Sequence, residues 1–211
     1  MTTATQAWER YAEKARPRRE TNAAGAATWL NWTQYPDHGP DEAVLGEVRG
    51  RTVLELGSGA GSNLAHLATL GAHCTGVDLA PSRAPAAQHS WGHLTNLDFV
   101  TADVVDYLTA TSATFDVVYS IFGAVWFIDP GILLPLVGNR MTPGGVFAFS
   151  HLPARTPATR SDRVITKWDH PAEHWVRSLN AQGFADATAE IIPAPTTDQP
   201  GTLLVRALAP A

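Results

Sequence analysis

The chain has 211 residues, of which 45% are hydrophobic and 17% are charged, and its formal net charge is −5. This length fits one domain, or one domain with a small cap, and the acidic balance argues against a general nucleic-acid binder, which needs a basic surface. The one basic cluster, Arg16 to Arg19, is interrupted by proline and flanked by Glu13 and Glu20, so we expect it to be a solvated surface.

The cysteine content and the apolar runs of the sequence indicate in which cellular compartment we expect the protein. Cys74 is the single cysteine, so no disulfide can form within the chain. The N-terminus lacks the features of a secretory signal, and no stretch approaches the roughly 18 apolar residues of a membrane span. We therefore expect a cytoplasmic protein with no membrane or nucleic-acid partner. No His, Cys or Asp cluster has the spacing of a metal site, so no metal is predicted.

The first part of the chain is rich in aromatic residues. A short helix is predicted at Thr5–Ala15, followed by a loop-like segment at 21–40 and a second short helix at Asp41–Val48. We interpret residues 1–50 as an N-terminal cap over the active site and residues 51–211 as the main domain.

From Thr52 onward, apolar strand patterns alternate with helical ones. The predicted strands are Thr52–Leu56, His73–Val77, Leu97–Thr101, Phe115–Tyr119, Val146–Ser150, Phe184–Ile192 and Thr202–Ala209. The predicted helices are Ser62–Leu70, Ser82–Ser90, Val104–Leu108, Gly131–Asn139 and Ala172–Ala181, and a loop is expected at Ala154–Ser161. Such alternation predicts an α/β fold, doubly wound around a mostly parallel sheet.

The most informative motif lies where the first of these strands meets the first helix. Three glycines, Gly57, Gly59 and Gly61, follow a strand that contains Glu55, and Asp78 ends the next strand. Free amide groups at the start of a helix can hold a nucleotide-like ligand, and a carboxylate on the second strand can accept hydrogen bonds from a ribose diol. The spacing differs from the dinucleotide pattern G-x-G-x-x-G/A, because Ser62 occupies the third small position.

The segment VLELGSGAGSNLAHLA, followed by HCTGVDLAPS, resembles the class I S-adenosylmethionine-dependent methyltransferases. DFVTADVVDYL, TFDVVYSIFGAVWF and MTPGGVFAFSH resemble later landmarks of that family, in the same order. The resemblance covers about residues 53–151 strongly. It implies a Rossmann-like, seven-stranded sheet whose last strand is antiparallel, and S-adenosyl-L-methionine as cofactor. It says almost nothing about the substrate.

The residues that we expect to contact the cofactor follow the carboxyl ends of the strands, where ligands of open parallel sheets bind. They are Glu55, Gly57, Ser58, Gly59, Gly61, Asn63, Asp78, Leu79, Asp103, Val104 and Ser120. The resemblance implies that Asn63 reaches the cofactor carboxylate and that Asp103 accepts from the adenine amine. Each has a structural alternative, since either side chain could instead cap a helix.

Methyl transfer from a sulfonium requires alignment and exclusion of water more than covalent help. His151 follows the fifth strand and is a candidate general base, but it could be structural and there could be no catalytic residue. The expected substrate pocket consists of Trp32, Tyr35, His38, Phe122 and Trp126. The alternative for these aromatic residues is packing of the cap on the core.

The function that we predict is transfer of a methyl group to an O, N or C nucleophile of a small molecule. The segment ATWLNWTQYPDHGP resembles the front end of actinobacterial small-molecule enzymes, many thought to serve secondary metabolism. The alternatives are a peptide or protein methyltransferase, a NAD(P)-dependent oxidoreductase, which Ser62 disfavours, and a non-catalytic module that retains the cofactor site. The sequence leaves the oligomeric state open.

Overall fold

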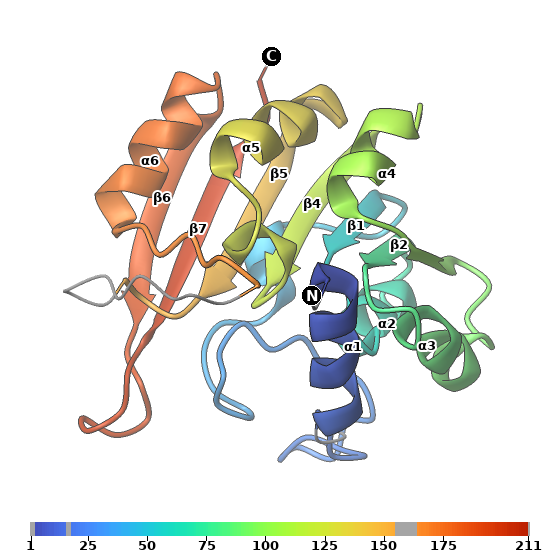
Figure 1. Ribbon diagram of the computed structural model, residues 1–211. Helices are drawn as coiled ribbons and strands as arrows, with labels where there is room; N and C mark the ends of the chain where they lie inside the picture. The colour runs from blue at the N-terminus through green and yellow to red at the C-terminus, as the bar shows by residue number, and fades with distance from the viewer. Residues whose placement is uncertain (1–2, 16–17, 155–163, 211) are drawn as a thin grey trace.

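The computed structural model describes residues 3–15, 18–154 and 164–210. Its centre is one seven-stranded sheet with strand order β3-β2-β1-β4-β5-β7-β6 (Figure 1). The strands are β1 (Thr52–Leu56), β2 (His73–Asp78), β3 (Leu97–Thr101), β4 (Phe115–Ile121), β5 (Met141–His151), β6 (Ala185–Ile192) and β7 (Thr202–Leu208). Strands β1 to β5 pair in parallel, and β7 pairs antiparallel with both β5 and β6. The predicted fold class is confirmed.

Helices and short 3₁₀ turns precede the first strand and connect the later ones (Figure 1). They are α1 (Ala4–Lys14), η1 (Glu42–Leu45), α2 (Ser62–Thr69), α3 (Arg83–Trp91), α4 (Val104–Ala110), η2 (Ala124–Trp126), α5 (Pro130–Asn139) and α6 (Ala172–Ala181). The predicted helix at Asp41–Val48 is shorter than expected and is a 3₁₀ turn, which ends where Gly46 adopts φ 75°. Strand β5 begins five residues before the predicted Val146, because Met141 pairs with Phe115 ahead of a bulge. The loop predicted at Ala154–Ser161 lies outside the described residues except for Ala154.

The sheet has a hydrophobic core on each face, because successive side chains of a strand point to opposite sides. Val53 belongs to the cluster that contains Leu64 and Leu67 of α2. Leu54 belongs to the other cluster, with Leu133 of α5. Burial on both faces explains why the central strands read as nearly continuous apolar runs in the sequence.

The N-terminal fifty residues differ in how they meet this core. Leu30, Trp32, Leu45 and Val48 are buried in the same cluster as β1 and α2. Helix α1, in contrast, has no buried residue. The division of the chain at residue 50 stays a prediction.

Among the described residues, none of the helices combines the length and apolar character needed to cross a bilayer.

Candidate active site

The loop between β1 and α2 depends on its glycines. Gly57, Gly59 and Gly61 have φ values of 81°, 55° and 74°, in the region that side chains disfavour. A Cβ on Gly57 would also lie 2.7 Å from the backbone nitrogen of Ala124, and one on Gly61 would overlap the ring of Phe99. The backbone therefore packs closely against its neighbours at Gly57 and Gly61 and leaves no room for side chains there, whereas at Gly59 only the positive φ disfavours a side chain.

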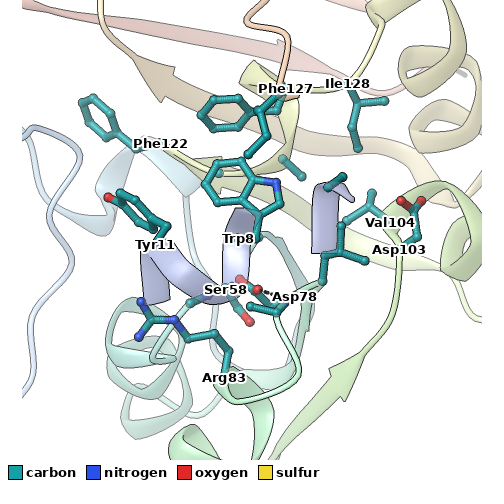
Figure 2. A pocket seen from close by; sticks show the side chains of 18 of the residues that line it. Trp8, Tyr11, Ser58, Asp78, Arg83, Asp103, Val104, Phe122, Phe127 and Ile128 are labelled. Atoms are coloured by element: carbon teal, nitrogen blue, oxygen red, sulfur yellow. Dashed lines mark hydrogen bonds between the residues drawn. The ribbon is translucent and has the colours of Figure 1, made fainter. Parts of the chain in front are cut away.

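Asp78 at the end of β2 fixes this loop. Its Oδ2 accepts a hydrogen bond of 2.8 Å from the backbone N–H of Gly59, and its Oδ1 accepts one of 2.9 Å from Ala80. A carboxylate oxygen has two lone pairs, so both oxygens can accept further bonds from a ribose diol. Asp78 lines the cavity described next (Figure 2).

A cavity of about 530 Å³ lies along the carboxyl edge of β1 to β4, which is within the usual range for small-molecule sites. Its polar side comes from the ends of β1 to β3 and from α2 and α3: Glu55, Gly57, Ser58, Gly59, Asn63, Asp78, Leu79, Ala80, Arg83, Asp103 and Val104. Its apolar side comes from α1, the segment after β4 and residues 164–168: Ala4, Trp8, Tyr11, Ile121, Phe122, Gly123, Ala124, Phe127, Ile128, Val164, Ile165, Thr166 and Trp168. Figure 2 shows Trp8 between the two sides, with Phe127 beyond it and Asp78 and Ser58 below.

Glu55 is the buried acid of this cavity. Its side chain is 2% exposed, and its Oε2 has no hydrogen-bond partner among the described residues. Burial, which penalises the charged form, raises its pKa to about 8, and the nearby Asp78 acts in the same direction, whereas Tyr119 and Arg18 oppose the shift. A bound ammonium group would supply the missing partner, so this carboxyl fits the amino group of S-adenosylmethionine.

Asn63 and Arg18 form a polar pair beside the glycine loop. Asn63 does not cap α2, whose N-cap is Gly61. Its Oδ1 accepts hydrogen bonds from Nη1 of Arg18 at 3.0 Å and from the backbone N–H of Asn31 at 3.2 Å, and its side-chain amide acts on Glu55 as a hydrogen-bond donor that opposes the rise of that pKa. Arg18 also donates to the carbonyl of Trp29 and stacks 3.7 Å from the centre of that ring.

The prediction of a solvated surface at Arg16–Arg19 is wrong for Arg18, although Arg16 and Pro17 lie outside the described residues. Arg18 is half-buried, and desolvation lowers its pKa to about 10. No local pattern separates Arg18 from the exposed Arg19, because its burial comes from contact with Trp29 and Asn63.

Asp103, at the end of β3, caps the following helix, and its role toward adenine stays a prediction. Its Oδ1 caps α4 by accepting from the backbone N–H groups of Val105 at 2.7 Å and Asp106 at 3.4 Å. Asp103 also lines the cavity with Val104, and Leu79 lies on the same wall. In the described part of the chain Oδ2 makes no hydrogen bond, so it is free to accept from an adenine amine.

Two of the expected cofactor residues do not line the cavity. Gly61 turns the chain into α2. Ser120 is buried, donates a 2.7 Å hydrogen bond to the carbonyl of Leu56 and accepts one of 3.4 Å from Val125. Both therefore shape the loops around the site instead of facing its contents.

Of the five aromatic residues expected in the substrate pocket, the structure places only Phe122 in the cavity wall. Trp32 is fully buried in the core. Tyr35 and His38 face the segment between β6 and β7, where their side chains bond the carbonyls of Pro200 and Pro193, each at 2.7 Å. Trp126 is buried beneath the site, and its Nε1 donates to Asp169.

His151 also lies outside the cavity wall. It is fully buried, with its ring stacked on Trp126 at 5.4 Å between centres and on Phe149 at 6.0 Å. Its Nδ1 lies 2.7 Å from the carbonyl of Leu152 and therefore donates, while its Nε2 has no partner among the described residues. Desolvation lowers its pKa to about 4, so the ring is neutral.

Part of the apolar wall was not predicted from the sequence. Trp8 and Tyr11 come from α1, and Trp168 precedes α6. The amphipathic pattern of residues 4–14 was the available signal for Trp8 and Tyr11. No comparable pattern marks Trp168, whose backbone N–H bonds the carbonyl of Trp126 at 2.9 Å.

Comparison with known proteins identifies the domain that this site belongs to. Residues 54–149 match the family model of a methyltransferase domain. The chain is 32% identical over 120 residues to a ubiquinone biosynthesis O-methyltransferase of Xanthomonas euvesicatoria, covering 56% of this chain and 50% of that protein. It is also 32% identical over 110 residues to a malonyl-[acyl-carrier protein] O-methyltransferase of Pseudescherichia vulneris, covering 52% of this chain and 42% of that protein. The chain thus spans about half the length of the curated relatives it matches.

Solved structures agree with this match. The 1,6-didemethyltoxoflavin-N1-methyltransferase of Burkholderia thailandensis, with bound 1,6-didemethyltoxoflavin and S-adenosylhomocysteine, superposes with a TM-score of 0.64 at 26% identity, over 81% of this chain and 75% of that one. The magnesium protoporphyrin IX methyltransferase of Synechocystis shares the fold, with a TM-score of 0.60 at 17% identity, over 79% and 78%.

Residues 54–149 therefore match a methyltransferase domain, the chain has the Rossmann-like fold of S-adenosylmethionine-dependent methyltransferases, and these matches support S-adenosylmethionine as the cofactor. This confirms the cofactor and the coarse family predicted from the sequence.

Proposed function

We propose that this chain, with the methyltransferase domain described above, transfers a methyl group from S-adenosylmethionine to an O, N or C nucleophile of a small molecule. The main support is a single observation: one cavity has both a polar side suited to an adenosyl amino acid and an apolar side, and the described residues of the apolar side carry no charged group. Relatives named as O- and N-methyltransferases support this reaction class and leave the acceptor atom open. A cytoplasmic location and a role in secondary metabolism belong to the same proposal.

Each part of the polar side has a task in this proposal. Asp78 accepts from the ribose hydroxyls, and Glu55 faces the cofactor ammonium. Asn63 faces its carboxylate, with Arg18 bonded to the side-chain oxygen of Asn63, while Asp103 receives the adenine amine. When bound, the cofactor supplies an electrophilic methyl on a sulfonium. The chain supplies alignment and exclusion of water, which can lower a barrier by roughly 7–11 kcal/mol in the best cases.

We further propose that the reaction has no protein base of the kind expected for His151. That histidine is neutral, buried and absent from the cavity wall. The acids that do line the cavity, Glu55, Asp78 and Asp103, are on the cofactor side. The acceptor nucleophile must then arrive with a lone pair or a negative charge of its own.

The proposal is tested in two steps. Thermal shift with S-adenosylhomocysteine and with NADH separates the methyltransferase from an oxidoreductase, and we expect stabilisation by S-adenosylhomocysteine only. Incubation of the protein and labelled S-adenosylmethionine with cell extract, followed by size separation, then shows where the label goes. Label in the small-molecule fraction supports the proposal, label in protein supports the peptide alternative, and no transfer supports a non-catalytic module.

A further inference from the structure

Phe122 is held in an unusual conformation at the cavity wall. Its φ of 49° lies in the left-handed region, where a bulky residue is rare and costly. The backbone is fixed on both sides, since the N–H of Phe122 donates a 2.8 Å hydrogen bond to Ser150 and a Cβ on the following Gly123 would overlap the carbonyl of Leu56. Strain of this kind points to a residue whose ring must occupy this place.

Helix α1 completes the same wall from the other side of the cavity. The ring of Trp8 packs edge to face on Phe127 with 4.6 Å between centres, and Trp8 contacts Tyr11 in the same manner at 5.6 Å (Figure 2). Yet α1 has no buried residue, although its sequence is amphipathic. Its apolar side borders the cavity, so a molecule bound there would complete the packing of the helix.

Two polar contacts hold α1 in this position. Glu9 accepts a 3.1 Å hydrogen bond from the backbone N–H of Ser82, just before α3. Arg83 donates a 3.4 Å hydrogen bond to the carbonyl of Ala12. The aromatic residues of α1 are thereby anchored to the element that follows Asp78, next to the cofactor side.

The chemistry of the apolar side restricts what it can accept. The charged residues that line the cavity, Glu55, Asp78, Arg83 and Asp103, all belong to the polar side. A charged acceptor would lose hydration without gaining a partner among the described side chains. A flat aromatic molecule, in contrast, gains edge and face contacts with the rings of Trp8, Phe122 and Phe127.

We propose that Trp8, Phe122 and Phe127 form the acceptor subsite and that the acceptor is a flat, uncharged aromatic compound. This inference rests on the proposed methyltransferase function and assigns the substrate class to its site. Phe122 is the specificity-determining residue, because its constrained backbone sets the direction of the Cα–Cβ bond and its ring packs edge to face on Trp126 with 6.0 Å between centres.

The test uses the full chain saturated with S-adenosylhomocysteine and three probes of similar size, measured by calorimetry. 2-Naphthol is flat and uncharged, naphthalene-2-sulfonate is flat and charged, and decahydro-2-naphthol is uncharged but not flat. We expect 2-naphthol to bind about tenfold more tightly than either of the others, as loss of aromatic contacts or burial of an unpaired charge implies.

The variant Phe122→Gly keeps the positive φ without strain, so it is expected to fold. It should weaken 2-naphthol binding about tenfold and leave the affinity for S-adenosylhomocysteine within about twofold. Ile132→Ala, a truncation of an exposed residue on α5, is the control and should change neither affinity.

Equal binding of the three probes, no binding of any, or unchanged 2-naphthol binding by Phe122→Gly would overturn the acceptor subsite. The proposed function would survive each of these results as long as S-adenosylhomocysteine binds. Failure of S-adenosylhomocysteine to bind would overturn both.

Discussion

The substitution Glu55→Gln should stabilise the ligand-free protein and weaken its binding of cofactor. Glu55 is buried, and its pKa of about 8 lies well above the ordinary value of 4.5. Gln has nearly the same shape but cannot ionise, so the variant isolates the effect of the charge.

The sign follows from proton binding. Between pH 4.5 and pH 8 the folded protein holds a proton on Glu55 that the unfolded chain has released. The contribution of protonated Glu55 to the free energy of unfolding is therefore fully present below pH 4.5 and is lost as the pH rises toward 8. At about 1.4 kcal/mol per pH unit, with partial ionisation near pH 8, the wild-type protein should lose about 2 kcal/mol relative to Glu55→Gln between pH 6 and pH 8.

Urea unfolding of both proteins at pH 6 and pH 8, without cofactor, measures this difference. Any fixed cost of burying the amide cancels between the two pH values. Glu190→Gln, which changes an exposed carboxylate on β6, serves as control: it retains Glu55 and should lose stability between pH 6 and pH 8 as the wild type does. A wild-type stability that stays parallel to that of Glu55→Gln over this range would refute the account of a buried, uncharged Glu55.

Three further predictions concern other parts of the site. Asp78→Asn should weaken S-adenosylhomocysteine binding by about 1.5–3 kcal/mol, because charge-assisted hydrogen bonds are lost; calorimetry that finds no change relative to Asp98→Asn, an exposed control on β3, would refute the ribose assignment. The wild type should lose about 3 kcal/mol of stability as the pH falls from 6.5 to 4, because the pKa of about 4 means that only the unfolded chain takes up a proton on His151 in that range. His151→Gln should remove this loss, which urea unfolding measures. A pH–rate profile altered by the substitution would contradict the place of His151 outside the reaction. Gly57→Ala should lower stability by about 1–3 kcal/mol through its positive φ and its contact with Ala124, and a thermal unfolding midpoint equal to that of the wild type would contradict the tight loop.

The sequence predicted the parts of the molecule that follow from short-range patterns. The strand carrying Glu55, the three glycines and Asp78 lie within one strand–helix–strand unit, and the order of a parallel sheet brings their ends to one edge. Strands β1 and β3 even have the predicted bounds, because apolar runs between turn residues define them.

The long-range contacts of the N-terminal segment could not be predicted in this way. Trp32 and Trp8 are both aromatic residues of the first fifty, yet Trp32 is buried beside Tyr119 and Trp8 borders the cavity. Their places depend on how residues 18–50 cross the sheet face and on bonds such as that of Arg18 to Asn63, which no local periodicity encodes. The aromatic residues of the sequence therefore indicated a pocket, but most of the side chains predicted to line it lie elsewhere in the structure.

We propose that the carboxyl edge of β1 to β3 holds an adenosyl amino acid. A crystal structure of the protein with S-adenosylhomocysteine is the direct test. We expect the ribose hydroxyls on Asp78, the adenine between Leu79 and Asp103, and the amino group facing Glu55. An empty cavity in such crystals, or the ligand bound elsewhere, would contradict it.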